Sequence, residues 1–392
     1  MNYLKIKNFG PVKDATIELK PFLVLIGGQG TGKSTIAKLL SIFQDYLWYI
    51  ALLQENENIN VPFIEYGISK YFNKNTYFEY NCNDISITYK EGKFNLEHKR
   101  FNNKENLQSF CGNIIAEKIN SLRIKMGFPA EQPIETFIEK NISFIKNYCA
   151  TALYIPAERN IAGTFSNALA SMIVANIPIA PLLVRYISYF ERARNEFPEY
   201  TLPIMGGIVY KYNEKEEGIV ISQGDESKLI PLSQCSSGLQ SLLPMMMILD
   251  YCIREEMFDS YVIEEPEQNL FPDNQLSVLR HIVGKRNSQN NSCIITTHSP
   301  YLLSGINISL MAGQVARYKV YKDEVCNILP AEYHLTPGRV TAYALGDTDN
   351  YCKDIINPQT GTIDQNYLDT TSTVIGQEFS KLYKLYIKTL KG

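Results

Sequence analysis

The sequence lacks the features of a secreted, disulfide-bonded or membrane-spanning protein. Its eight cysteines are scattered, with no C-x-x-C pair and no cysteine–histidine cluster at metal-ligand spacing, so we expect reduced thiols. The opening residues, MNYLKIKNFG, have no unbroken apolar stretch of the kind that marks a secretory signal. The most apolar run, 172–184, is interrupted by Asn176, Pro178 and Pro181 and is too short to cross a bilayer. These absences predict a cytoplasmic protein without a membrane segment.

The sequence also has no excess of positive charge. It contains 38 lysines and arginines against 41 aspartates and glutamates, a formal net charge of −3, so no global positive field attracts nucleic acid. Hydrophobic residues make up 45% of the chain and charged residues 20%, which excludes a mainly disordered scaffold. A chain of 392 residues can bury a large core, in about two or three domains or in one large head with insertions.

The pattern of apolar residues predicts a mixed α/β protein. Strands are expected near 3–6, 15–19 and 22–26, antiparallel strands within 77–99 and 207–232, and strands at 261–263 and 293–297 around a helix at 275–283. The alternation after residue 260 is typical of a parallel sheet with crossover helices. Segments 103–148 and 161–205 are expected to be largely helical insertions, without the heptads of a coiled-coil arm. We expect the residues after about Gly305 to form a small C-terminal extension.

A glycine-rich segment follows the predicted strand at 22–26. The residues GGQGTGKS fit the pattern G-x-x-x-x-G-K-[ST] and open a predicted helix. Glycines allow backbone N–H groups to converge on phosphate oxygens, and the helix N-terminus adds partial positive charge. Lys33 is expected to reach the β and γ phosphates of a nucleotide, and the Ser34 hydroxyl to bind Mg²⁺. The candidate nucleotide-binding residues are Gly27, Gly28, Gln29, Gly30, Thr31, Gly32, Lys33, Ser34 and Thr35.

Two acidic residues follow the predicted strand at 261–263. In a P-loop enzyme this is the place of the metal carboxylate and, one residue on, of the base that activates the attacking water. We assign Glu264 to Mg²⁺, which its longer arm can reach through the water shell of the metal. We assign Glu265 to the general base, because successive side chains at a strand end point to opposite faces. A solvated acidic loop is the alternative interpretation.

A histidine follows the next predicted strand along the chain. Cys293 to Thr297 read as a buried strand, and His298 comes directly after it. A neutral imidazole there can hydrogen-bond the γ-phosphate or the attacking water and so sense which nucleotide is bound. A structural role is the alternative, but the position one strand beyond the paired glutamates favours a place in the catalytic site.

A further predicted helix start carries hydroxylated residues and a glycine. Ser236, Ser237 and Gly238 precede an apolar segment, as the capped N-terminus of a helix would. Phosphate loop, SSG, paired acids and histidine follow in this order, and the set resembles the ABC-class ATPase head shared by RecF, Rad50 and SMC proteins. The likeness covers residues 1–305 and is strongest to the OLD (overcoming-lysogenization-defect) type and related ATPases of bacterial defence systems. It rests on NFGPVKDATIEL, YIPAERN, SSGLQS, EEPEQNLFP and TTHSPYLL.

The resemblance implies a fold, an activity and an assembly. The fold would be a P-loop NTPase with an ABC-type head, which has a mixed sheet and an antiparallel β subdomain, and the activity would be Mg²⁺-dependent ATP hydrolysis. In such heads SSG is the signature motif, which binds the γ-phosphate of a nucleotide held by the other subunit, so a homodimer would sandwich ATP. EEPE corresponds to the Walker B strand with its catalytic glutamate, and His298 to the switch histidine. Residues 1–305 would form the ATPase domain and residues 306–392 the extension.

The sequence departs from that family in two places. YIPAERN stands where the family has a glutamine loop but contains no glutamine, so a role of Glu158 or Arg159 in the site and a plain salt bridge are equally open. OLD nucleases continue into a metal-dependent Toprim domain, whereas fewer than ninety residues follow Gly305. Asp347 and Asp349 match a Toprim D-x-D, but no strand ending in an acidic metal ligand is predicted before them, which favours a solvated turn.

We therefore expect an ATP-driven dimeric switch that controls a partner protein, an effector in an anti-phage defence module. Two other functions stay open on the sequence alone. A DNA-repair ATPase of the RecF type would clamp DNA directly, and it would need a continuous basic groove. An autonomous nuclease of the OLD type would need a cluster of three carboxylates near Asp347.

Overall fold

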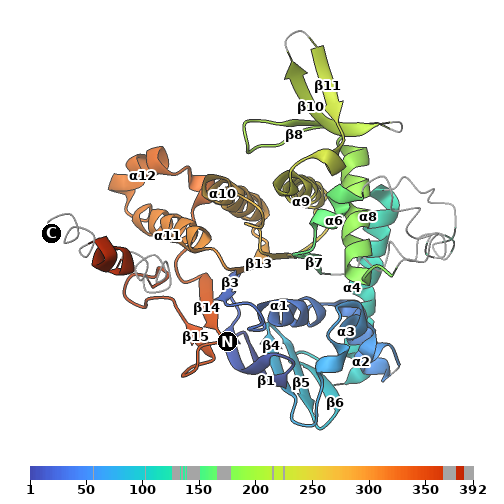
Figure 1. The fold of residues 1–392 in the computed structure, drawn as a ribbon. Coiled ribbons are helices and arrows are strands. Elements are labelled where there is room, and N and C mark those ends of the chain that lie inside the picture. Colours follow the sequence, from blue (N-terminus) through green and yellow to red (C-terminus); the bar gives the residue numbers. More distant parts are fainter. Residues whose placement is uncertain are drawn as a thin grey trace.

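The computed structural model describes residues 1–55, 57–101, 103–125, 151–165, 178–213, 216–223, 226–364 and 377–383, with single residues at 133, 136 and 138. The strands of its central sheet are β3 (Phe22–Gly27), β7 (Ala152–Ile155), β12 (Ser260–Glu264), β13 (Ser292–Thr297), β14 (Val340–Leu345) and β15 (Cys352–Asp354). Their order is β15-β14-β3-β13-β12-β7, and β15 is antiparallel to β14 while the other neighbours are parallel (Figure 1). The predicted α/β fold with a mixed sheet is confirmed.

Alternate residues along the central strands belong to two separate cores, one on each face of the sheet. Val24 and Ile295 pack into one core, whereas Leu25 and Ile294 pack into the other. Because both faces are covered, the strands read as nearly unbroken apolar runs. The helices on one face are α9 (Ser237–Arg254), α10 (Pro272–Gln289) and α11 (Pro300–Val315), and α1 (Lys33–Ile42) lies on the other face (Figure 1).

A five-stranded antiparallel sheet of order β2-β1-β4-β5-β6 lies on the α1 side of the molecule (Figure 1). Its strands are β1 (Tyr3–Phe9), β2 (Val12–Glu18), β4 (Tyr77–Cys82), β5 (Ile85–Lys90) and β6 (Lys93–His98). The antiparallel strands predicted within 77–99 are therefore confirmed, with the hairpin turn between Lys90 and Lys93. The short helices α2 (Tyr46–Gln54) and α3 (Val61–Glu65) pack near this sheet through aromatic side chains such as Trp48, whose ring stacks on Phe43 at 5.4 Å.

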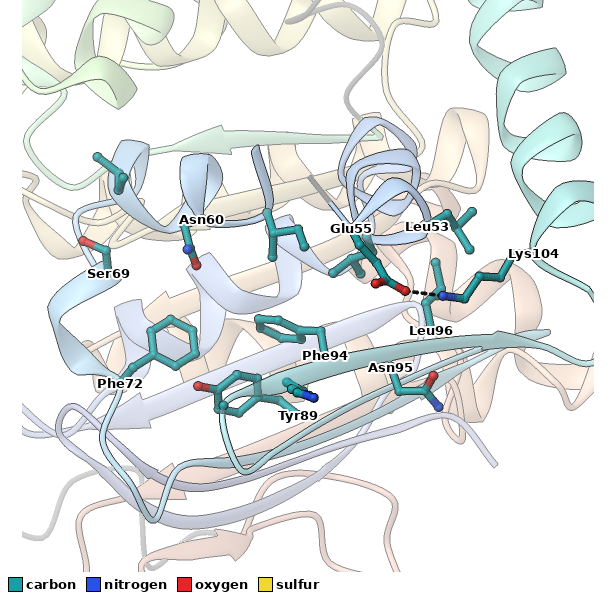
Figure 2. Close-up of a pocket in the computed structure, with 15 residues that line it drawn as sticks. Leu53, Glu55, Asn60, Ser69, Phe72, Tyr89, Phe94, Asn95, Leu96 and Lys104 are labelled. Atoms are coloured by element: carbon teal, nitrogen blue, oxygen red, sulfur yellow. Dashed lines mark hydrogen bonds and ion pairs between the residues drawn. The ribbon is translucent and has the colours of Figure 1, made fainter. Parts of the chain in front are cut away.

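A cavity of about 860 Å³ lies between these helices and the hairpin of β5 and β6 (Figure 2). The aromatic rings of Phe72, Tyr89 and Phe94 form part of its lining. Among the described residues that line it, the one acid is Glu55, which forms an ion pair with Lys104 (Figure 2). The described lining residues include none of the phosphate loop, and none of them has a free carboxylate or an imidazole that could activate water.

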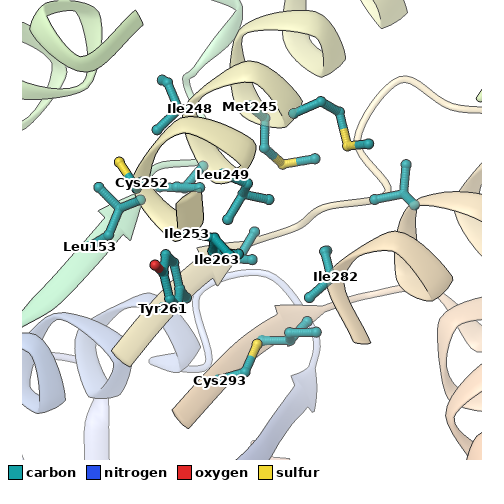
Figure 3. Close-up of a cluster of buried hydrophobic side chains, with 14 of the residues drawn as sticks. Leu153, Met245, Ile248, Leu249, Cys252, Ile253, Tyr261, Ile263, Ile282 and Cys293 are labelled. Carbon is teal, nitrogen blue, oxygen red and sulfur yellow. The ribbon is translucent and has the colours of Figure 1, made fainter. Parts of the chain in front are cut away.

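The hydrophobic core between α9 and the central sheet includes buried side chains from both α9 and β12. Met245, Met246 and Met247 are fully buried, and Figure 3 shows Met245 and Leu249 of α9 on the side that faces Ile263 of β12. These side chains carry no polar atoms that need a partner, and methionine fills irregular gaps between helix and sheet. The position of α9, which begins with the SSG segment, is thus fixed by packing against the central sheet.

A second antiparallel sheet, of order β11-β10-β9-β8, stands beyond α9 (Figure 1). Its strands are β8 (Glu199–Thr201), β9 (Val209–Tyr212), β10 (Glu217–Gln223) and β11 (Glu226–Ile230), which confirms the strands predicted within 207–232. The predicted helical insertions contain α4 (Lys104–Lys125), α6 (Asn160–Thr164) and α8 (Pro181–Glu196). Most of 126–150 and all of 166–177 lie outside the described residues.

The segment after residue 305 contributes a strand to the interior of the central sheet. β14 pairs with β3 in parallel from Val340 opposite Phe22 to Leu345 opposite Gly27. The strands expected from the sequence do not include this one. It ends in Leu345, two residues before Asp347, and not in an acidic residue that could hold a metal. The apolar run VTAYAL between Gly338 and Gly346 is the sequence signal of this strand. Helices in this segment include α12 (Lys322–Ile328) and residues 377–383. The domain boundary at 305 stays a prediction.

No single helix in the described part of the chain is long and apolar enough to cross a membrane. Helices α1 and α2 meet the length and composition of a span only when taken together, and they bend by 72° at the break between them. The seven cysteines among the described residues are free thiols.

Candidate active site

The phosphate loop connects β3 to α1 and has the strand–loop–helix context that its motif requires. Gly30 and Gly32 have φ angles of 73° and 87°, in the left-handed region that favours glycine. Helix α1 begins at Lys33, so the free N–H groups and the partial positive charge of its first turn lie at the loop. Ser34 is exposed, whereas Lys33 and Thr35 are buried. The loop therefore offers an anion site beside the accessible hydroxyl of Ser34.

The side chain of Lys33 folds back over its own loop. Nζ donates hydrogen bonds to the carbonyl oxygens of Gly27 and Gly28, at 2.8 and 2.9 Å. Burial lowers the pKa of Lys33, and the negative charge of Glu265 and two neighbouring glutamates opposes that change. A phosphate would give the same ammonium a charged acceptor, which forms a stronger hydrogen bond than a carbonyl does.

The two glutamates at the end of β12 have different surroundings. Glu264 is 3% exposed, and its Oε2 accepts a hydrogen bond from the backbone N–H of Ala157 at 3.3 Å. Its Oε1 is buried and has no hydrogen-bond partner among the described residues. Glu265 is more open, and its φ of 42° is rare for a residue other than glycine. Such backbone strain concentrates at functional sites, so it supports a role for Glu265 beyond a solvated loop.

His298 lies between Lys33 and Glu265. Its Nε2 is 2.7 Å from Glu265 Oε1, and its Nδ1 is 3.5 Å from Lys33 Nζ. Because an ammonium can only donate, Nδ1 acts as the acceptor, and the neutral imidazole then carries its proton on Nε2 toward the carboxylate. The structure thus brings together three side chains that the sequence predicted from three separate motifs.

Glu267 is a residue of the site that the sequence interpretation did not assign. Its Oε1 accepts hydrogen bonds from Thr297 Oγ1 at 2.6 Å and from the backbone N–H of His298 at 2.9 Å. These bonds tie the loop after β12 to the end of β13, and they fix the point from which the imidazole projects. Glu267 belongs to the EEPE segment, but only its burial at 8% exposure distinguishes it from an acid on a solvated loop.

Arg159 stabilises the end of β12 through hydrogen bonds to its backbone. The side chain is 1% exposed, and its Nη1 and Nη2 donate to the backbone carbonyls of Glu264 and Glu265, both at 2.6 Å. Burial lowers the pKa of Arg159, as expected for a cation that is removed from water. The sequence left open a salt bridge or a role in the site. Among the described residues, Arg159 forms no salt bridge and no hydrogen bond with the side chains of Glu264 and Glu265, and it instead braces the backbone that carries them. Glu158 is exposed at the same turn.

The SSG segment, residues 236–238, begins α9 as predicted. Ser236 is the N-cap residue, and its Oγ accepts a hydrogen bond from the backbone N–H of Leu239 at 3.4 Å. A Cβ on Gly238 would lie 2.8 Å from the carbonyl oxygen of Asn269, so the helix start packs against the loop after β12. Among the residues that the structure describes, no hydrogen bond or ion pair joins this helix start to the phosphate loop. One chain therefore does not add SSG to the site around Lys33.

The oxygen atoms of the site fit a magnesium–nucleotide complex. Mg²⁺ is commonly bound by one or two carboxylates together with substrate phosphates and water. The exposed Ser34 hydroxyl and the unpartnered Oε1 of Glu264 are the oxygens that the site offers. In the described part of the chain, no group of three or more histidine, cysteine, aspartate or glutamate side chains could hold a metal. A metal here would therefore depend on the phosphates of the nucleotide.

A glycine-rich loop between a strand and a helix, with acids and a histidine at the ends of neighbouring parallel strands, defines a P-loop ATPase. The chain belongs to the AAA ATPase domain family, whose model matches residues 1–178 and 184–303. The comparison with curated proteins gives no match.

Three solved SMC head structures are distantly similar to the chain. The first is the Smc head bound to the C-winged helix domain of ScpA, with 12% identity over 90% of this chain and 96% of that chain, and a TM-score of 0.39. The second is the Smc head domain with an extended coiled coil bound to the C-terminal domain of ScpA from Pyrococcus furiosus, with 14% identity, coverage of 77% and 90%, and a TM-score of 0.35. The third is the SMC head domain from Thermotoga maritima, with 14% identity, coverage of 78% and 92%, and a TM-score of 0.34. These likenesses are too distant to carry an argument about function.

Replacing Arg159 with methionine should lower the free energy of unfolding by about 1.5–3 kcal/mol, because two buried carbonyls lose charged donors. The matched control is Arg254→Met, which removes exposed ion pairs with Glu196 and Glu255 and should cost less than about 1 kcal/mol. Urea unfolding followed by circular dichroism measures both values. Equal losses would show that Arg159 does not brace the end of β12.

Proposed function

We propose that the chain binds ATP with Mg²⁺ at the phosphate loop and hydrolyses it. The observation that carries the proposal is the row of contacts from Lys33 through His298 to Glu265, with steps of 3.5 and 2.7 Å. It places a phosphate-binding cation next to a carboxylate that is open enough to meet water. The membership of the AAA ATPase domain family supports the same conclusion.

Each residue has a role that follows from its position. The loop N–H groups and Lys33 bind the β and γ phosphates, and Ser34 and Glu264 hold Mg²⁺, which would offset the negative charge of the phosphates. Glu265 takes a proton from the water that attacks the γ-phosphorus, the bond from that phosphorus to the bridging oxygen breaks, and ADP leaves with the electron pair. His298 keeps the Glu265 carboxylate oriented through its Nε2 proton. Its Nδ1 contacts Lys33, so the imidazole would sense the γ-phosphate through the position of that ammonium.

We further propose that two chains form a homodimer with ATP between them. Within one chain the SSG segment packs against the loop after β12 and not against the phosphate loop. A helix N-terminus with serine hydroxyls can still neutralise a γ-phosphate that another copy presents. A two-fold interface allows this at both sites at once, because each copy then offers the same two surfaces.

The output that we propose is control of a partner protein, an effector in an anti-phage defence module. The motifs that resemble OLD-type ATPases support this proposal. A direct DNA clamp gains no support from the net charge of −3. An autonomous nuclease gains none from the carboxylates near Asp347, because the described residues contain no metal-binding cluster.

Lys33→Ala should abolish tight ATP binding, because the methyl group of alanine cannot replace the compact ammonium that is expected to contact the β and γ phosphates. Glu265→Gln should keep the affinity but slow hydrolysis by about a hundredfold or more, since only the base is lost. Calorimetry with ATP and Mg²⁺ and a phosphate-release assay distinguish the two defects. Unchanged affinity in the first variant, or near-normal turnover in the second, would contradict the assigned roles.

Two inactive variants should complement each other if each site is shared between subunits. Lys33→Ala keeps a sound SSG segment, and Ser237→Asp keeps a sound phosphate loop while placing a carboxylate against the γ-phosphate. Ser237 is exposed, so the change should not disturb packing. Random exchange makes half of the dimers mixed, each with one intact site of two, so about a quarter of the wild-type ATPase rate should return.

The matched control for this exchange is Lys33→Ala mixed with Glu265→Gln. Both changes damage the same half of the shared site, so that mixture should stay inactive. Recovery in both mixtures, or in neither, would contradict the two-subunit site.

The purified chain alone should leave supercoiled plasmid intact in Mg²⁺ or Mn²⁺, because two-metal cleavage needs a cluster of carboxylates. Agarose gel electrophoresis measures nicking. Nicking that disappears with Asp347→Ala or Asp349→Ala would establish a nuclease instead.

A further inference from the structure

The segment that follows β14 curves back over the phosphate loop. Leu345, the last residue of β14, pairs with Gly27 at the start of the loop. Residues 346–351 then form a turn, closed by a hydrogen bond from Gly346 N to Tyr351 O at 2.9 Å, and lead into β15. We call these residues the β14–β15 turn. β14 lies beside β3, and β15 lies on the far side of β14 (Figure 1). One wall of the phosphate loop therefore comes from the C-terminal part of the chain.

Tyr351 is the residue of this turn that bonds to the phosphate loop. Its hydroxyl lies 2.6 Å from the carbonyl oxygen of Thr31 and 2.9 Å from that of Pro11, in the turn between β1 and β2. Both carbonyls can only accept, so the phenol donates, and its single proton favours the closer oxygen. Burial raises the pKa of Tyr351 to about 12, so the hydroxyl keeps its proton near neutral pH and remains a donor.

Close contacts prevent the loop and the turn from moving independently. A Cβ on Gly346 would lie 2.4 Å from Thr31 Cγ2, and a Cβ on Gly32 would lie 3.2 Å from the Tyr351 hydroxyl. Gly346 also has a φ of 95°, which other residues rarely adopt. The backbone of the phosphate loop is therefore held in place by the β14–β15 turn on one side and by α1, which continues directly from it.

We propose that Tyr351 is a positioning residue for nucleotide binding, which keeps the phosphate loop ordered by holding the carbonyl of Thr31. The proposal rests on the proposed function, ATP binding at this loop. A loop that is ordered before the ligand arrives binds more tightly, because less conformational freedom is lost on binding. The acceptors within reach of the Tyr351 hydroxyl belong to Thr31 and Pro11, not to Glu265 or His298. Its loss therefore weakens binding of substrate and transition state alike.

The test compares two identical substitutions in the same hairpin. Tyr351→Phe removes the hydroxyl that faces the phosphate loop. Tyr343→Phe removes the hydroxyl on β14 that accepts a hydrogen bond from the backbone N–H of Glu18 at 2.9 Å, outside the phosphate loop. Thermal unfolding, calorimetry with ATP and Mg²⁺, and steady-state ATPase assays are made on both variants and on the wild type.

Tyr351→Phe should raise Kd and KM for ATP about three- to tenfold and leave kcat within about twofold, as expected for a lost interaction common to ground and transition states. Tyr343→Phe should lower the melting temperature to a similar extent and leave Kd and KM unchanged. A wild-type KM in Tyr351→Phe, or an equal rise in both variants, would overturn the proposal.

A second pair of variants tests the same contact without the tyrosine. Gly346→Ala should weaken ATP binding, because its Cβ would meet Thr31 Cγ2. Adding Thr31→Ser removes that methyl group and should recover part of the affinity. No recovery would contradict coupling through this contact.

A wild-type chain that binds no ATP would refute the proposed function and this inference together. Normal wild-type affinity with an unaffected Tyr351→Phe would refute only the inference.

Discussion

Parallel pairing of β14, β3, β13 and β12 places the carboxyl ends of four strands at one edge of the sheet. The phosphate loop follows one of these strands, the paired glutamates follow another, and His298 follows a third. Each group arrives at the site because its strand ends there, although the segments are far apart in the sequence. The buried side chains of Arg159 and Glu267 then fix the strand ends relative to one another, through bonds to backbone groups. The geometry of the site depends on this alignment more than on any single contact.

The electrostatics of the site explain why a nucleotide and a divalent cation would be bound together. Lys33 lies within the field of Glu264, Glu265 and Glu267. The phosphates of ATP would add further negative charge beside these carboxylates, and one ammonium with the helix N-terminus cannot offset all of it. A magnesium ion between Ser34 and Glu264 would supply the missing positive charge. The same reasoning assigns Glu265, which is more open and faces His298, to proton transfer and not to metal binding.

The sequence predicted those parts of the site that rest on strand–loop–helix patterns. The phosphate loop and the placement of Glu265 and His298 together followed from short apolar runs and the residues after them. It did not predict the roles of Arg159 and Glu267, because both act through burial and through bonds to backbone groups, which leave no periodic pattern. It also missed β14, because VTAYAL is short and lies in a segment that was expected to be peripheral. With β14 it missed Tyr351, whose place at the phosphate loop depends on a strand pairing between residues more than three hundred positions apart.

The central claim is that one site, at the carboxyl ends of these strands, binds ATP and Mg²⁺ for hydrolysis. A crystal structure of Glu265→Gln with ATP and Mg²⁺ tests it most directly. We predict that Lys33 Nζ leaves the carbonyls of Gly27 and Gly28 and contacts the β and γ phosphates. We also predict Mg²⁺ beside Ser34, with Glu264 bonded to the metal or to its water. A nucleotide bound elsewhere, for instance in the cavity between α2 and the β5–β6 hairpin, or a Lys33 that keeps its carbonyl bonds while ATP is bound, would contradict the account.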